Sequence, residues 1–222
     1  MKEIAGYPAE LIRVNLESED SHDSAAIELY SVARLDEIVD GRALLRGSPG
    51  VDPPYWALVW IGAQAIARRL AADAQGGRVL DLGCGLGLSG LVAARQADKV
   101  VFADYAPDAL EFVRASIEHN RLTNTEVRLC DFTTDVCGEP YDCILAADVV
   151  YDPASYDALV AFLDRHLADD ATLLLTETLR ADARNVIAAL NARGLVGDKE
   201  ALWITEDGKP ERTWLHTLRR RD

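Results

Sequence analysis

The sequence predicts an α/β fold in which a doubly wound, mostly parallel sheet ends in an antiparallel C-terminal hairpin. Two observations support this prediction. Short, almost wholly apolar runs alternate with helical patterns from residue 78 to residue 193, which is typical of parallel strands covered by helices on both faces. Further on, two β-like runs flank the turn formers Asp207 and Gly208, and this pattern indicates a hairpin.

Five strands are expected before the hairpin, in the runs RVLDLG, KVVFAD, EVRLCD, YDCILAAD and ATLLLTET, which start at residues 78, 99, 126, 141 and 171. Helical patterns span 56–73, Leu88–Gln96, Pro107–Arg121, Ser155–Ala168 and Ala181–Arg193. The hairpin strands are expected at 201–205 and 213–220. Together these runs predict a seven-stranded sheet.

The N-terminal part differs from this regular alternation. It contains a strand-like run at 10–16, an acidic stretch at 17–24 and a segment rich in turn formers at 46–55. We expect residues 1–52 to form an extension of short strands that acts as a lid or a substrate surface. The α/β domain is expected to span 53–222.

The charge composition indicates which class of molecule the protein is suited to bind. The 222 residues include 37 acidic and 23 basic ones, for a formal net charge of −14. Such a surface disfavours nucleic acid, whose affinity comes largely from phosphate contacts, and favours a cationic partner such as a Lys-rich protein segment. Alternatively, the excess of acidic residues only keeps the protein soluble.

Nothing in the sequence indicates a membrane or a metal. The apolar runs are too short to span a bilayer, and the N-terminus lacks the apolar core of a secretory signal. The four cysteines form no C-x-x-C pair, so we interpret them as reduced apolar residues rather than zinc ligands or disulfides. These features predict a cytoplasmic protein without a metal site.

The glycine-rich run LDLGCGLGLSG, from Leu80 to Gly90, has two registers. From Gly85 it matches the dinucleotide pattern G-x-G-x-x-G, which predicts an oxidoreductase; from Asp81 it is D-L-G-C-G-L-G. An acidic residue about 20 positions on, here Asp104, suits either register. A carboxylate at position 81 would sit poorly beside a pyrophosphate and would suit a cationic group, so we favour the second register, with Gly90 inside the following helix.

This run, followed by Asp104 and by LCDF ending in Asp131 and Phe132, resembles the class I S-adenosylmethionine-dependent methyltransferases. The resemblance implies a Rossmann-like methyltransferase fold that binds S-adenosyl-L-methionine and releases S-adenosyl-L-homocysteine. The cofactor residues that it and the glycine run suggest are Trp60, Asp81, Gly83, Cys84, Gly85, Gly87, Asp104, Tyr105, Asp131, Phe132 and Ala147.

Several of these residues have specific expected roles. Glycines let the backbone pass close under the cofactor, and Asp104 would accept hydrogen bonds from both ribose hydroxyls. Asp131 and Phe132 would contact adenine. The resemblance places Trp60 against the cofactor, although its i, i+4 spacing from Trp56 also suits an ordinary buried stripe.

Two further runs, PPYWALVW at 53–60 and ADVVYD at 147–152, resemble the protein-lysine methyltransferases that include the enzyme of the electron-transfer flavoprotein β subunit. The resemblance implies a protein substrate with an accessible lysine, and that subunit is one candidate. The N-P-P-Y element typical of enzymes that methylate amides is absent. A small-molecule amine N-methyltransferase, an NAD(P)-dependent oxidoreductase and a non-catalytic binding module on the same fold remain alternatives.

The D-x-x-Y element, Asp148 to Tyr151, supplies the expected catalytic residues. Free lysine has a pKa near 10.4, so it arrives charged and must lose a proton before transfer. Asp148 would bind and aim the ammonium group, and Tyr151 would hydrogen-bond the amine and wall the channel. The alternative is a turn in which Asp152 and Pro153 start the next helix.

Overall fold

The predicted α/β sheet is present in the computed structural model, which describes residues 2–16, 26–35, 54–178, 183–206 and 209–220. Its seven strands lie in the order β6-β5-β4-β7-β8-β10-β9. The first five in that order are parallel, and β10 is antiparallel to both of its neighbours. The doubly wound, mostly parallel sheet with an antiparallel C-terminal hairpin is therefore confirmed.

The parallel strands are β4 (Arg78–Leu82), β5 (Lys99–Asp104), β6 (Thr125–Leu129), β7 (Tyr141–Ala146) and β8 (Leu167–Thr178). Strand β8 begins four residues earlier than predicted. The hairpin strands β9 (Leu195–Glu206) and β10 (Lys209–Arg220) are also longer than predicted, because they stay paired in register from Glu206–Lys209 to Leu195–Arg220.

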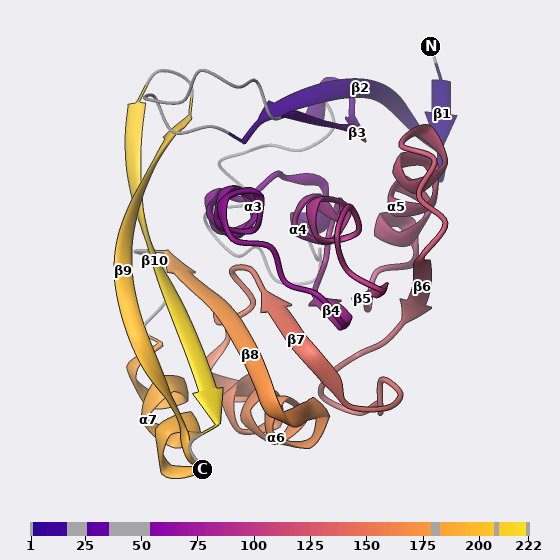
Figure 1. The fold of residues 1–222 in the computed structure, drawn as a ribbon. Coiled ribbons are helices and arrows are strands. Elements are labelled where there is room, and N and C mark those ends of the chain that lie inside the picture. Colours follow the sequence, from indigo (N-terminus) through magenta and orange to yellow (C-terminus); the bar gives the residue numbers. More distant parts are fainter. Residues whose placement is uncertain (1, 17–25, 36–53, 179–182, 207–208, 221–222) are drawn as a thin grey trace.

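Helices cover both faces of this sheet (Figure 1). One face carries α3 (Ile61–Ala72), α4 (Leu88–Ala93) and α5 (Pro107–His119), and the other carries α6 (Tyr156–His166) and α7 (Arg184–Ala192). Side chains of one strand alternate between the two cores: Val100 and Phe102 belong to the first, and Val101 and Ala103 to the second. Burial on both faces explains why these strands are apolar throughout.

The helix predicted over 56–73 is wrong at its start. Residues Tyr55–Ala57 form a short 3-10 turn, η1, and α3 begins only at Ile61. Trp60 has an extended backbone, with φ −65° and ψ 148°, and its Nε1 donates a hydrogen bond to the Tyr55 carbonyl at 2.9 Å. Trp56 instead packs on Tyr7 and Phe112. The two tryptophans therefore do not form one helical stripe.

A second, three-stranded antiparallel sheet comes from the N-terminal part: β1 (Lys2–Ile4), β2 (Tyr7–Asn15) and β3 (Ala26–Val32). It lies over α5 (Figure 1). The Tyr30 amide donates to Ser116 Oγ at 2.9 Å, and Asn120 Nδ2 donates to the Glu28 carbonyl at 2.7 Å. The acidic stretch 17–24 and the proposed boundary between residues 52 and 53 lie outside the described residues.

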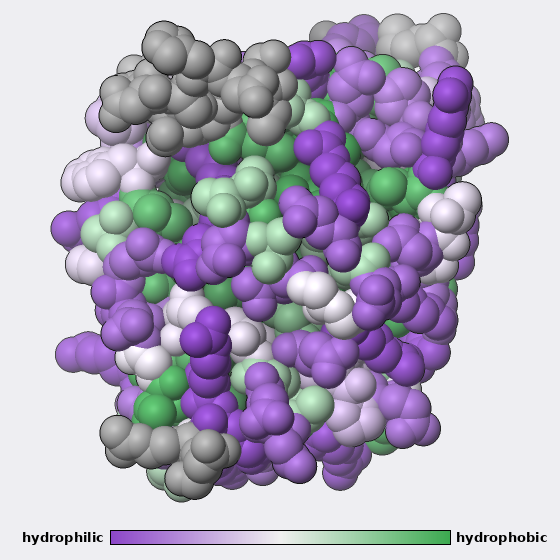
Figure 2. Space-filling model, in the orientation of Figure 1, coloured by the Kyte–Doolittle hydropathy of each residue, from purple (hydrophilic) through white to green (hydrophobic). Residues whose placement is uncertain are grey.

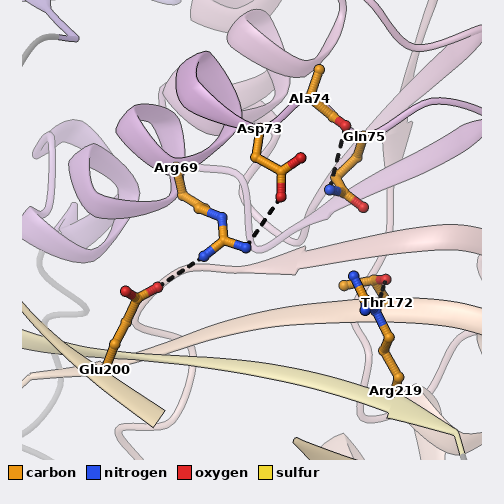
Figure 3. Close-up of polar contacts among 7 residues, drawn as sticks. All are labelled: Arg69, Asp73, Ala74, Gln75, Thr172, Glu200 and Arg219. Atoms are coloured by element: carbon orange, nitrogen blue, oxygen red, sulfur yellow. Dashed lines mark hydrogen bonds and ion pairs between the residues drawn. The ribbon is translucent and has the colours of Figure 1, made fainter. Parts of the chain in front are cut away.

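Polar contacts join α3 to the hairpin and the hairpin to β8 (Figure 3). Arg69 bonds Glu200 of β9 at 3.0 Å and Asp73 at 3.2 Å, and Arg219 Nε donates to Thr172 Oγ1 at 3.2 Å. Such partly exposed ion pairs add little stability each, so the buried cores hold these elements together.

The surface in view is mostly hydrophilic, with apolar side chains in scattered groups (Figure 2). Among the helices that the structure describes, none combines the length and apolar character needed to cross a membrane. All four cysteines are free thiols, and only Cys84 is partly exposed. His166 and His216 are buried.

Candidate active site

The candidate active site lies at the switch point of the sheet, between β4 and β7. The chain runs from β4 to β5 and β6 on one side and continues with β7 and β8 on the other. In doubly wound sheets, ligands bind outside the carboxyl ends of the strands at such a point. Here the two loops approach closely, because a Cβ on Gly83 would lie 2.7 Å from Val149 Cγ1.

The glycine-rich turn after β4 has an unusual backbone. Gly83, Gly85 and Gly87 have φ values of +61°, +51° and +79°, in the left-handed region that residues with a Cβ rarely adopt. A Cβ on Gly85 would also lie 3.1 Å from the Trp56 carbonyl oxygen, so the segment before α3 lies over the turn. Gly90 is inside α4, as predicted.

Asp81 lies beneath α4, with 2% of its surface exposed. Its Oδ2 accepts a hydrogen bond from the Gly90 amide at 2.9 Å, one of the first-turn amides that have no partner within a helix. Burial, with a smaller contribution from nearby Asp104, raises the pKa of Asp81 to about 8. The dinucleotide register would require a pyrophosphate at this helix end, where the Asp81 carboxylate already lies, so the geometry favours the register that starts at Asp81.

Asp104, at the end of β5, faces the same turn. Its Oδ2 accepts from the Gly85 amide and its Oδ1 from the Ala106 amide, both at 2.9 Å. Burial raises the pKa of this carboxyl group above its usual value. The Tyr105 amide also contributes a hydrogen bond to this carboxylate, so of its roughly four lone-pair sites about one remains for a hydroxyl.

Asp148 joins three elements beyond the end of β7. Its Oδ2 accepts from the Gly62 amide in the first turn of α3 at 2.9 Å, and its own amide donates to Thr176 Oγ1 of β8 at 3.2 Å. Its φ of +53° is a left-handed conformation that Asp tolerates better than most residues but that still costs energy. Backbone strain held by surrounding contacts is common at functional sites.

The remaining predicted residues lie around this centre with different degrees of exposure. Cys84 and Ala147 are partly buried against the core beneath α3 and α4. Phe132 packs edge-to-face on Phe162 at 6.4 Å, and Asp131 Oδ1 accepts from the amide and hydroxyl of Thr133. Trp60 folds back on Tyr55.

Two tyrosines are more exposed than their expected roles suggest. Tyr105 is 49% exposed and Tyr151 61% exposed, so the channel wall expected of Tyr151 stays a prediction. Asp152 caps η2 (Pro153–Ser155) through a 3.0 Å bond from the Ala154 amide to Oδ1. The helix-capping interpretation therefore holds for Asp152, next to the D-x-x-Y element.

Sequence reasoning missed two residues that position Asp148. A Cβ on Gly62 would lie 2.6 Å from Asp148 Cγ, so only glycine allows the carboxylate to reach this amide. Thr176 is fully buried and accepts from the Asp148 amide. A glycine in an alanine-rich helical run was a usable signal, because glycine in a helix costs about 1 kcal/mol relative to alanine and needs a reason.

A family model described as lysine methyltransferase matches residues 55–189. The chain belongs to the lysine methyltransferase family. The matched region contains every candidate residue from Trp60 to Tyr151, and the family resemblance expected from the motifs is confirmed.

Relatives of this chain are named for protein-lysine methylation. It is 35% identical over 126 residues to the electron transfer flavoprotein beta subunit lysine methyltransferase of Xenopus laevis, a match that covers 55% of this chain and 51% of that protein. It is 33% identical over 135 residues to the protein N-lysine methyltransferase METTL21A of Danio rerio, covering 56% and 61%. The chain therefore matches only about half to three-fifths of the length of these relatives.

Among solved structures, the N-methyltransferase NodS from Bradyrhizobium japonicum WM9, in complex with S-adenosyl-l-homocysteine, superposes with a TM-score of 0.61. The match covers 82% of this chain and 98% of that one at 18% sequence identity. This likeness shows the Rossmann-like methyltransferase fold of the chain.

Proposed function

We propose that this protein transfers a methyl group from S-adenosyl-L-methionine to the side-chain amine of a lysine in a protein substrate. The observation that supports this most is Asp148, held in a left-handed conformation by Gly62 and Thr176 at the switch point, next to a glycine cradle. A fixed carboxylate at that place suits a cationic acceptor.

The residues of the glycine turn fit the cofactor. Cβ atoms at Gly83 and Gly85 would meet Val149 and Trp56, so glycines let the turn keep this close-packed path at the proposed cofactor site, and Asp104 has acceptor capacity left for a ribose hydroxyl. Asp81 is a buried acid that a cationic amino group would convert to its carboxylate form. Asp131 and Phe132 are proposed to contact the adenine.

The acceptor side depends on positioning. The cofactor supplies a methyl group on a sulfonium, and the lysine nitrogen displaces the thioether in line, so that an N–C bond forms as the C–S bond breaks. Asp148 binds the ammonium form and orients it, the proton leaves to water, and the neutral amine remains in place. Rate acceleration then comes mainly from orientation and desolvation. Tyr151 is proposed to hydrogen-bond the amine.

The formal net charge of −14 suits a partner with a Lys-rich surface. The electron-transfer flavoprotein β subunit is the first candidate, because relatives of this chain are named for that substrate. We also propose a cytoplasmic location, the kind of reducing compartment in which four free thiols persist.

Tritiated methyl transfer to the purified flavoprotein β subunit and to a proteome lysate tests this function. We expect label in a protein band, and loss of that label in Asp148→Asn but not in Asp157→Asn, a matched change on the exposed first turn of α6. Label only in small amines would favour the small-molecule alternative. Calorimetry that detects NADH binding but no S-adenosylhomocysteine binding would refute the proposed cofactor.

A further inference from the structure

A polar pocket lies between β2 and α3. Its volume is about 450 Å³, and its walls come from β2, residues 57–59, α3 and the carboxyl end of β9. Gln64 and Arg68, one turn apart on α3, line it, whereas Gly62 on the same helix meets Asp148. Residues two apart lie about 200° around a helix, so the pocket and Asp148 are on opposite sides of the start of α3.

The pocket is cationic in a strongly acidic chain. Its charged lining residues within the described part of the chain are Arg13 and Arg68, with the polar residues Asn15, Gln64 and Thr205 among the others. No acidic side chain lines it there, and neither arginine forms an ion pair with a described residue. Two guanidinium groups are the preferred partners of a carboxylate.

Two details add to this charge pattern. Arg68 Nε is buried without a hydrogen-bond acceptor among the described residues, and a buried donor without an acceptor costs free energy. Glu28 lies opposite Arg13 in the register of β2 and β3, but its carboxylate contacts His119 Nε2 at 2.9 Å. Arg13 and Arg68 thus remain available to an external anion.

We propose that this pocket binds an acidic side chain of the protein substrate, about three residues along the chain from the methylated lysine. The spacing follows from geometry: the path around half of a helix about 10 Å across is about 15 Å, three residues of extended peptide cover about 10 Å of it, and the lysine and acidic side chains span the rest. The inference rests on the proposed function, since it assigns a specificity pocket to the same substrate.

Two eleven-residue peptides test it, each with one central lysine among neutral residues. One carries glutamate three residues to either side of the lysine, and the other carries glutamine there. We expect the glutamate peptide to have a KM about fivefold to tenfold lower, the size of a partly exposed charge-assisted pair. Arg68→Gln and Gln64→Glu should each remove this preference, and Arg165→Gln, on the exposed surface of α6, should retain it.

Fluorescence anisotropy of the same peptides separates this inference from the proposed function. Suppose that neither peptide is methylated, but the glutamate peptide still binds about fivefold more tightly and Arg68→Gln removes the difference. This result would support the pocket as a binding site for an acidic side chain and would contradict the proposed methyl transfer. Equal binding and equal KM for the two peptides, or an equal preference in wild type and Arg68→Gln, would overturn the pocket. Binding of S-adenosylhomocysteine to each variant verifies that it is folded.

Discussion

Replacing Gly62 by alanine should damage the acceptor half of the site and leave the cofactor half intact. Alanine normally stabilises a helix by about 1 kcal/mol relative to glycine. At this position the added Cβ would lie 2.6 Å from Asp148 Cγ and would also overlap Thr176 Oγ1. The carboxylate must therefore move away from the Gly62 amide.

The size of the effect follows from two destabilising contributions and one stabilising contribution. Overpacking costs about 1–3 kcal/mol, and loss of a hydrogen bond to a charged group costs about 1.5–3 kcal/mol. After subtraction of the helix preference of alanine, we expect the free energy of unfolding to fall by about 3 kcal/mol. For a chain of this size that lowers Tm by roughly 6–12 °C. A displacement of about 1 Å at a reacting centre can reduce turnover about 100-fold.

Scanning calorimetry, S-adenosylhomocysteine titration and methyl transfer together measure this prediction. We expect Gly62→Ala to show the lower Tm, cofactor binding within about threefold of wild type, and methyl transfer reduced about 100-fold. Gly76→Ala is the matched control, because no heavy atom lies within 4 Å of its would-be Cβ. Unchanged Tm and full transfer in Gly62→Ala would refute the reasoning about Asp148.

Three further variants test the other carboxylates. Asp104→Ala should weaken S-adenosylhomocysteine binding about 100-fold by calorimetry, because a hydrogen bond from the ribose to a buried carboxylate is lost; a change below about threefold would exclude ribose binding by this residue. Asp148→Ala should keep cofactor affinity within about twofold and reduce transfer about 100-fold, and full turnover would remove its assigned role. The pKa of Asp81 is raised from 3.8 to about 8 in the folded protein, so the folded state binds this proton more tightly than the unfolded state does. The resulting contribution to the free energy of unfolding is fully present below pH 3.8 and is lost as pH rises toward about 8. Asp81→Asn should therefore gain stability relative to wild type between about pH 4 and pH 8 in urea titrations, and a constant difference across that window would contradict the burial argument.

The strands of the sheet could be predicted from the sequence because each one is a short, continuous and mostly apolar run. The runs at 78–82, 99–104 and 141–146 are mostly apolar on both faces and end at, or within two residues of, a glycine or an aspartate, so local composition was sufficient to locate them. The start of α3 was predicted wrongly, since the spacing of Trp56 and Trp60 is helical. Contacts with Tyr7 and Phe112, distant in sequence, hold Trp56 instead, and periodicity contains no information about them.

The candidate site was predictable as a set of strand-end residues but not as a geometry. Motif spacing located Asp81, Asp104 and Asp148 at strand ends. The contact between Asp148 and Gly62 joins residues 86 apart in sequence, and no local pattern specifies it. The same holds for the placement of the N-terminal sheet over α5, which depends on the packing of one unit on another.

The antiparallel course of β10 has a practical consequence for handling the protein. Because β10 runs opposite to β8, it ends at Arg220 near the amino ends of the parallel strands, whereas Asp148 lies at their carboxyl ends. A fusion partner, affinity tag or surface linkage attached after Arg220 would leave the candidate site facing free solution. The same attachment between β9 and β10 would lie at the carboxyl ends of the parallel strands, where the proposed protein substrate would approach Asp148.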